Sequence, residues 1–206
     1  MIEDFAELSH IQIDALKEIG NIGAGNAATA LAQLINTKID MTVPKISILP
    51  FNEVPTLVGG PDMPVTAIFL LVQGDAAANI LFMLPVASAR ILVDMVMCQP
   101  TGSNDHFNEI EQSALMEIGN ILAATYLNAM ASFTALSFRP SVPALAFDMA
   151  GAILDTVLAQ LGQVGDHVLL LETDFKKDDQ EVVGHFFLLP EPGALDLILA
   201  ALGVNN

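Results

Sequence analysis

Two long stretches of the chain alternate apolar and polar positions with the period of an α-helix. In residues 14–35, apolar or small side chains recur at steps of three and four positions, and a similar spacing continues from about residue 108 to 133. This spacing puts the apolar side chains on one helix face and leaves the opposite face polar. The sequence therefore predicts two long amphipathic helices, the second capped at its start by Asn108 or a neighbouring residue.

Segments rich in β-branched and apolar residues follow each predicted helix. Three segments in each half are typical of strands: residues 37–49, 65–72 and 80–84, then residues 137–146, 166–175 and 182–189. A shorter helix is predicted at the end of each half, from Pro85 to about Met97 and after Pro190. Since strands and helices do not alternate regularly, the pattern predicts an α+β protein with a mainly antiparallel sheet of six strands.

The two halves share a motif. Residues 14–22 read DALKEIGNI and residues 113–121 read SALMEIGNI, at an offset of 99 positions. An internal repeat of this kind indicates a duplicated structural unit. We therefore predict a single domain, residues 1–206, made of two repeats of approximately residues 9–98 and 108–203 with pseudo-twofold symmetry. The second repeat is expected to carry an added helix at residues 148–161, where the first has a loop rich in Pro and Gly at residues 55–64.

The polar faces of the two long helices carry the candidate functional residues. Glu18 and Asn21 lie about 60° apart on one face of the first helix, and Glu117 and Asn120 lie in the same way on the second. One exposed Glu and Asn on a helix is usually no more than a solvated surface. Asn is a poor helix former, however, and solvation does not require it twice at one distance from a Glu. We therefore predict two exposed Glu/Asn sites.

The glycines that follow Asn21 suggest an alternative, a loop that binds the phosphates of a nucleotide. The second copy argues against this interpretation, because Leu122 and Ala124 stand where the first copy has Gly23 and Gly25. No strand precedes the motif. We favour a continuous helix in which the glycines allow close packing against a neighbouring helix.

Composition restricts the partners. With 24 acidic and 7 basic residues the formal charge is -17, so we expect no nucleic acid partner, and phosphate chemistry would need a partner that brings its own cation. The apolar runs are far shorter than the roughly 20 residues of a membrane-spanning helix. The acidic N-terminus is unlike a secretory signal, and Cys98 is the single cysteine. The predicted protein is cytoplasmic, without membrane contact, and its scattered histidines predict no metal site.

Both copies of the motif resemble the signatures of the CheC family of bacterial chemotaxis phosphatases, whose relatives include CheX and the phosphatase part of the flagellar-switch protein FliY. The first copy extends this resemblance through residues 14–30, and the likeness covers essentially the whole chain. Two intact copies are typical of CheC, and the additional C-terminal domain of FliY is not expected. The resemblance implies hydrolysis of the aspartyl phosphate of the response regulator CheY.

The resemblance also implies roles for the four candidate residues. Asn21 and Asn120 would position the attacking water, because an amide both donates and accepts hydrogen bonds. Glu18 and Glu117 would mainly pair with the partner's active-site Lys, and general-base assistance is a less favoured alternative. The implied protein has no cofactor of its own, since the phosphorylated partner supplies the Mg²⁺.

A second implied partner is the receptor-modifying deamidase CheD. Residues 146–153 look like the family's CheD-contacting segment, with Asp148 in the matching acidic position. Asp148 is equally suited to cap the added helix, and both interpretations stay open at this point. The alternative function is therefore a non-catalytic module that binds CheD in chemotaxis adaptation. A structural component of the flagellar switch is a third, less favoured possibility.

Overall fold

The structure is a computed structural model that describes residues 8–35, 40–100, 106–161, 167–177 and 179–204. Its helices are α1 (His10–Ile35), α2 (Val54–Leu57), α3 (Val86–Met97), α4 (Glu109–Thr134), α5 (Ala150–Leu161) and α6 (Ala194–Ala201), and a 3-10 turn, η2 (Phe51–Glu53), precedes α2. Its strands are β1 (Asp40–Pro50), β2 (Pro64–Gly74), β3 (Ala78–Pro85), β4 (Phe138–Pro140), β5 (Ala144–Met149), β6 (His167–Lys177) and β7 (Gln180–Pro190).

The described strands form one antiparallel sheet in the order β1-β6-β7-β3-β2-β4, with β5 also paired to β2. The prediction of an α+β protein with an antiparallel sheet is confirmed. The prediction of six strands is wrong, because the segment expected at residues 137–146 is divided into β4 and β5. Pro140 and Pro143 flank the break, and proline has no N–H with which to continue a strand ladder.

The strand order reads the same from both edges once each element is exchanged for its counterpart in the other half. Strands β1, β2 and β3 then correspond to β4/β5, β6 and β7. The register between the central strands agrees, since Leu81 pairs with Phe187 and Phe82 with Phe186, and exchanging counterparts turns one pair into the other. This arrangement is compatible with the predicted pseudo-twofold symmetry, and the duplication itself stays a prediction.

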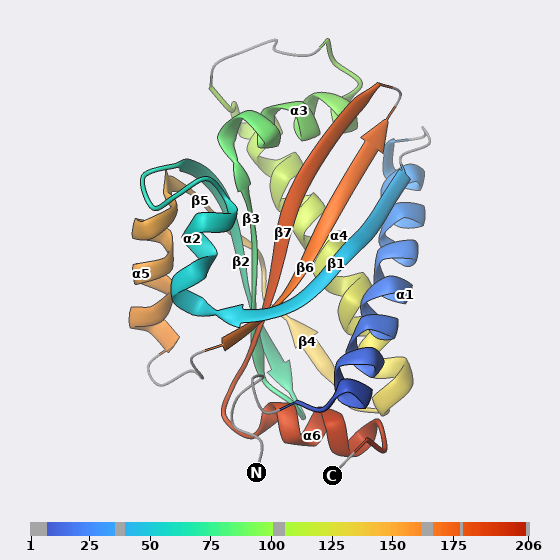
Figure 1. Cartoon of the computed structure of the whole chain (residues 1–206). Helices are drawn as coiled ribbons and strands as arrows, with labels where there is room; N and C mark the ends of the chain where they lie inside the picture. The colour runs from blue at the N-terminus through green and yellow to red at the C-terminus, as the bar shows by residue number, and fades with distance from the viewer. Residues whose placement is uncertain (1–7, 36–39, 101–105, 162–166, 178, 205–206) are drawn as a thin grey trace.

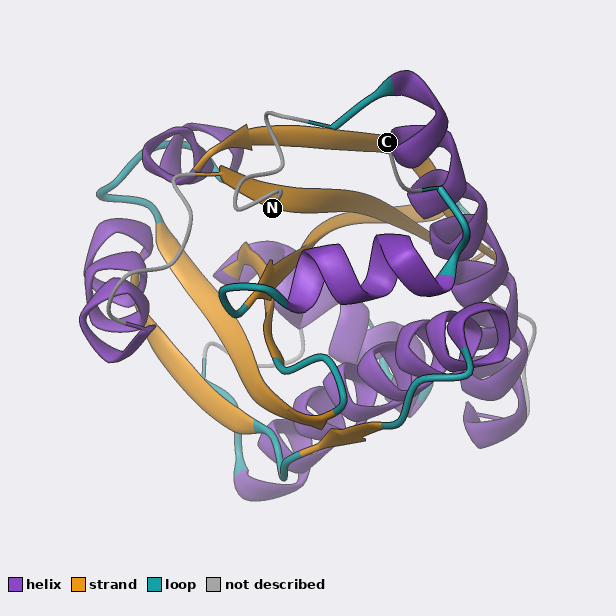
Figure 2. Ribbon diagram, turned by 90° about the horizontal axis from the view of Figure 1, so that it is seen from below, coloured by secondary structure: helices purple, strands orange, loops and turns teal. Residues whose placement is uncertain are grey.

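Helices cover both faces of the sheet (Figures 1 and 2). The larger core lies between one face and helices α1, α3, α4 and α6, and the smaller core lies between the other face and α2 and α5. In β3, Ile80 and Phe82 point into the larger core while Leu81 and Met83 point into the smaller one. Burial on both faces explains why this strand is apolar without interruption.

The glycine-rich part of the first motif is helical, as predicted. A Cβ atom at Gly23 would lie 2.4 Å from Cδ1 of Tyr126 on α4, so α1 and α4 approach each other at a position where only glycine fits without displacement. A Cβ atom at Gly25 would meet no atom within 4 Å. Close helix packing therefore explains Gly23 and does not explain Gly25.

Three of the differences from the sequence prediction concern helices. Helix α1 begins at His10, four residues earlier than expected, because Ser9 and Gln12 form a cap there. The expected loop at residues 55–64 contains part of α2; its first residue, Val54, and the residue after it, Val58, are buried in the smaller core. Helix α5 begins at Ala150, two residues later than expected, and α2 is its short counterpart in the first half. None of the described helices combines the length and the apolar character that a membrane span requires.

Candidate functional site

The two Glu/Asn pairs lie on the outward faces of α1 and α4. Glu18, Asn21 and Glu117 are exposed and Asn120 is half-buried. The residues on the opposite faces are buried in the larger core, among them Leu16, Ile19, Leu115 and Ile118. The predicted surface position of both pairs is confirmed, and it follows from the helical period of the apolar residues behind them. Their predicted chemical roles stay predictions.

The hydroxyl groups near the pairs are occupied by their own helices. Thr29 Oγ1 donates to Gly25 C=O at 3.0 Å, Ser113 Oγ donates to Glu109 C=O at 2.8 Å, and Thr125 Oγ1 donates to Ile121 C=O at 2.9 Å. Within the part of the chain that the structure describes, the four Glu and Asn side chains take part in no hydrogen bond or ion pair. Their polar groups are therefore free to meet a ligand or a partner.

The surface beside each pair is low. One turn after Asn21 stands Gly25, which has no side chain, and one turn after Asn120 stands the half-buried Ala124. A partner's backbone or a loop can therefore approach the carboxylate and amide groups closely. This is a property of a docking surface, whereas a small-molecule site is normally concave.

Charges near the two pairs differ. Asp14, one turn before Glu18 on α1, forms an exposed ion pair of 3.7 Å with Lys17, the residue directly before Glu18. The corresponding positions on α4 are Ser113 and Met116. An exposed pair of this kind contributes little to stability. It leaves the first site with more charged groups than the second.

The N-terminus of α4 is held by a buried ion pair that the sequence analysis missed. Asn108 Oδ1 accepts from the N–H groups of Ile110 and Glu111 at 3.0 Å each, and Glu111 Oε2 accepts from the N–H of Asn108 at 2.8 Å. Arg90 on α3 donates to Glu111 Oε1 at 2.7 Å. The guanidinium bond and the Asn108 N–H lower the pKa of Glu111 from its ordinary value. The spacing Asn-x-x-Glu is the signal that predicts such a capping box.

Aromatic rings extend this network. The guanidinium of Arg90 lies 4.0 Å from the centroid of the Phe107 ring, and Phe107 stacks on Phe147 of β5 at 5.1 Å. Cation–π and stacking contacts of this kind favour one orientation of the rings. The start of the second site's helix is thereby tied to both α3 and the sheet edge.

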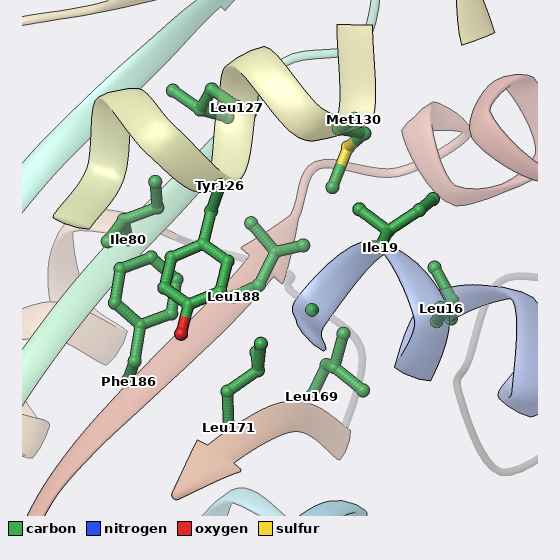
Figure 3. Close-up of a pocket in the computed structure, with 11 residues that line it drawn as sticks. Leu16, Ile19, Ile80, Tyr126, Leu127, Met130, Leu169, Leu171, Phe186 and Leu188 are labelled. Atoms are coloured by element: carbon green, nitrogen blue, oxygen red, sulfur yellow. The ribbon is translucent and has the colours of Figure 1, made fainter. Parts of the chain in front are cut away.

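An apolar cavity lies behind the first site (Figure 3). It lies between α1, α4 and the sheet, and its volume is about 20 Å³. The residues around it include Leu16, Ile19, Tyr126, Leu169 and Phe186. A cavity of this size holds no more than a water-sized molecule and offers little polar surface. The cavity is therefore too small and too apolar to serve as a substrate site.

Asp148 lies on a different element from the two pairs. It is an exposed residue of β5, opposite Val65, and its Oδ1 accepts from the N–H of Met149 at 2.8 Å. Because α5 begins at Ala150, the interpretation of Asp148 as a helix cap is wrong. The first N–H groups of α5 bind loop carbonyls instead, with Ala150 donating to Met63 and Gly151 to Pro61, both at 2.9 Å.

Asp148 borders a concave surface between β5 and α5 with a volume of about 300 Å³. Phe147 also lines it and is 40% exposed, and the neighbouring Met149 is 52% exposed. Exposed apolar side chains around a hollow are typical of a protein-binding surface.

Among the described residues, no three His, Cys, Asp or Glu side chains are grouped so that they could hold a metal ion.

Comparisons with known proteins agree with the two-part pattern. The model of the CheC-like family matches residues 11–48 and again residues 110–146. The chain is 39% identical over 205 residues to the CheY-P phosphatase CheC of Bacillus subtilis, which covers 98% of both chains. It is 29% identical over 132 residues to the flagellar motor switch phosphatase FliY of the same organism, which covers 64% of this chain and 34% of that one.

Solved structures show the same fold. The crystal structure of FliY from Thermotoga maritima superimposes with a TM-score of 0.74 at 17% identity, over 96% of this chain and 98% of that chain. At this low identity the match supports the arrangement of helices and strands alone.

Proposed function

Because the chain belongs to the CheC-like family, we propose that it hydrolyses the aspartyl phosphate of a CheY-type response regulator at the two Glu/Asn pairs. The observation that carries the proposal is the repeated pair itself: Glu18/Asn21 and Glu117/Asn120 stand on the outer faces of two helices with their polar groups unoccupied among the described residues. A relative that matches almost the whole chain is a CheY-P phosphatase.

In the proposed reaction this chain only positions the attacking water. The oxygen of a water molecule attacks phosphorus, the bond from phosphorus to the aspartyl oxygen breaks, and the aspartate leaves as a carboxylate. The phosphoryl group departs as inorganic phosphate with the water's oxygen, and the water's protons pass to phosphate and solvent. The chain's part is to place the water in line, which Asn21 and Asn120 do by accepting one hydrogen bond and donating another.

Glu18 and Glu117 have a docking role in this proposal. A response regulator carries a lysine at its phosphorylated site, and a carboxylate that pairs with this lysine orients the complex. The Mg²⁺ belongs to the partner, and this chain contributes no cofactor. The charge of -17 supports a macromolecular substrate, since free phosphate compounds are repelled unless a cation accompanies them.

Phosphate release from a phosphorylated response regulator tests the proposal. Changing both Asn21 and Asn120 to Ala should slow release roughly 100-fold, because misplacing the water by about an ångström costs that much. The matched control is Asn52→Ala, an exposed asparagine of η2 away from both helices, which should keep the wild-type rate. A double variant as active as the control would reject the proposal.

We also propose that the surface around Asp148 binds CheD. The concave surface between β5 and α5, with exposed apolar side chains and an acidic residue at its border, favours a protein partner there. The change Asp148→Lys should weaken association with CheD and leave phosphate release unchanged, while Asp179→Lys, at the distant β6–β7 turn, should do neither. If the wild type binds CheD but releases no phosphate, the non-catalytic regulatory module becomes the better account.

A further inference from the structure

An exposed isoleucine precedes each Glu/Asn pair by the same distance. Ile11 lies seven residues before Glu18, and Ile110 lies seven residues before Glu117. Both side chains are 70% exposed. Seven helical residues are nearly two full turns, so each isoleucine lies within about 20° of its Glu on the same face, about 10 Å away along the axis.

The packing of the helices does not account for these side chains. Asn108 caps α4, so Ile110 occupies the second helical position, and Ile11 does the same after Ser9. The hydrophobic contact that stabilises a helix start joins the residue before the cap to the fourth helical residue, which leaves the second position out. Isoleucine is β-branched and a mediocre helix former, so nothing local favours it at an exposed first turn.

A single exposed apolar residue needs no explanation, but here an exposed isoleucine occurs at equivalent positions of both helices. The same residue type stands at the same helical position, at the same distance from a Glu/Asn pair and with the same exposure in both halves. The two segments matched by the CheC-like family model begin at Ile11 and at Ile110. The two sites therefore share an isoleucine at the same helical position and with the same exposure, although the buried residues of the two helices differ.

We propose that Ile11 and Ile110 are apolar docking residues, each of which the response regulator buries when it engages the Glu/Asn pair on the same helix. This inference rests on the proposed function. A specific interface covers about 800 Å² on each partner, which corresponds to a radius of about 16 Å around its centre. An isoleucine about 10 Å from the Glu lies inside that area.

Charge also favours the response regulator as the occupant. Between the isoleucine and the pair, α1 carries Asp14, which is paired with Lys17, and α4 carries the uncharged Ser113. Neither surface has an excess of positive charge there, and the phosphorylated site of the partner carries Mg²⁺ and a lysine. Complementary charges orient an encounter, while an apolar side chain at the edge of the contact supplies affinity. The isoleucine binds the partner and does not take part in the chemistry.

The test isolates one site at a time. In the Asn120→Ala background only the pair on α1 is active. There, Ile11→Ser should raise the apparent KM for the phosphorylated response regulator five- to twentyfold with kcat within a factor of two, as expected for losing the burial of one side chain. Ile110→Ser should change neither constant in that background. In the Asn21→Ala background the two substitutions should exchange their effects.

Each isoleucine thus serves as the matched control for the other, and Leu158→Ser, an exposed leucine of α5, controls for the loss of any apolar surface residue. Equal KM values for the two isoleucine variants, or a fall in kcat alone, would overturn the inference. A change in the molecular mass in solution with an unchanged KM would also overturn it, because a second copy of the chain would then be the occupant.

A binding measurement distinguishes a failure of this inference from a failure of the proposed function. The same variants are titrated with a response regulator that carries beryllium fluoride in place of the phosphoryl group, in the presence of Mg²⁺. If the wild type binds this probe without releasing phosphate from the natural form, the proposed function fails, and weaker binding by the isoleucine variants still supports docking. Unchanged binding by all isoleucine variants would reject docking whatever the catalytic result.

Discussion

Helices α1 and α4 present the same Glu/Asn pair, but different interactions hold each helix in place. At the start of α1 the contacts are neutral: the N–H of Ser9 donates to Gln12 Oε1 at 2.8 Å, and Gln12 Nε2 donates to the C=O of Val204 at 2.9 Å. At the start of α4 a carboxylate, Glu111, stands in the position of Gln12 and binds the buried Arg90. The two helices therefore share the exposed Glu/Asn pair but not the interactions that hold their N-termini in place.

The interiors of the two helices differ as well. Gly23 on α1 faces the ring of Tyr126, and the corresponding residue of α4 is Leu122, which is fully buried. Glycine costs about 1 kcal/mol relative to alanine inside a helix, so α1 depends more on tertiary contacts than α4 does. The comparison teaches that the outward Glu/Asn geometry needs a helix held against the sheet, by whatever contacts each half provides.

Breaking the ionic support should have the largest effect. Glu111→Gln keeps a capping side chain but removes the carboxylate that binds the buried Arg90, and we expect the free energy of unfolding to fall by about 3 kcal/mol. The matched change in the other half, Gln12→Ala, removes neutral hydrogen bonds and should cost about 1 kcal/mol. Urea denaturation of both variants measures the difference. Equal losses would contradict the distinction between the two helix starts.

Acid should reduce the loss of stability that Glu111→Gln causes. Glu111 has a pKa below its ordinary value of 4.5, so its stabilising contribution is complete above pH 4.5 and is lost as the pH falls through the lower pKa of the folded protein. The gap in unfolding free energy between the wild type and Glu111→Gln should therefore narrow below about pH 4.5. Denaturation curves between pH 7 and pH 3 test this. A constant gap would show that the carboxylate's charge is not what stabilises α4.

The glycines of α1 provide the third comparison. Gly23→Ala places a Cβ atom against Tyr126 and should lower the free energy of unfolding by about 2 kcal/mol. Gly25→Ala, two positions away in open space, should raise it by about 0.5 to 1 kcal/mol through helix propensity. Thermal unfolding of the two variants gives the signs. Stabilisation by both changes would contradict the close approach of α1 and α4.

The regular parts of this fold are predictable because periodicity is a local property. The spacing of apolar residues was sufficient to place Glu18 and Glu117 on outward helix faces, where the structure has them. The Asn108 cap was predictable for the same reason. The ion pair of Glu111 with Arg90 joins α3 to α4, and no sequence spacing specifies such a contact.

The errors around Asp148 have a related cause. An acidic residue just before an apolar helical pattern has the composition of a cap, but pairing with β2 extends the strand through Met149. The carbonyls of Met63 and Pro61, which lie far away in the sequence, then satisfy the first N–H groups of α5. Sheet pairing between distant segments overrides a local capping preference.

The most direct test of the two-site account is the rate of phosphate release by four proteins: the wild type, Asn21→Ala, Asn120→Ala and the variant with both changes. Each single variant should keep the activity of its intact pair, so that the two single rates add up to the wild-type rate, and the double variant should release phosphate roughly 100-fold more slowly than the wild type. Wild-type release by the double variant would contradict the account.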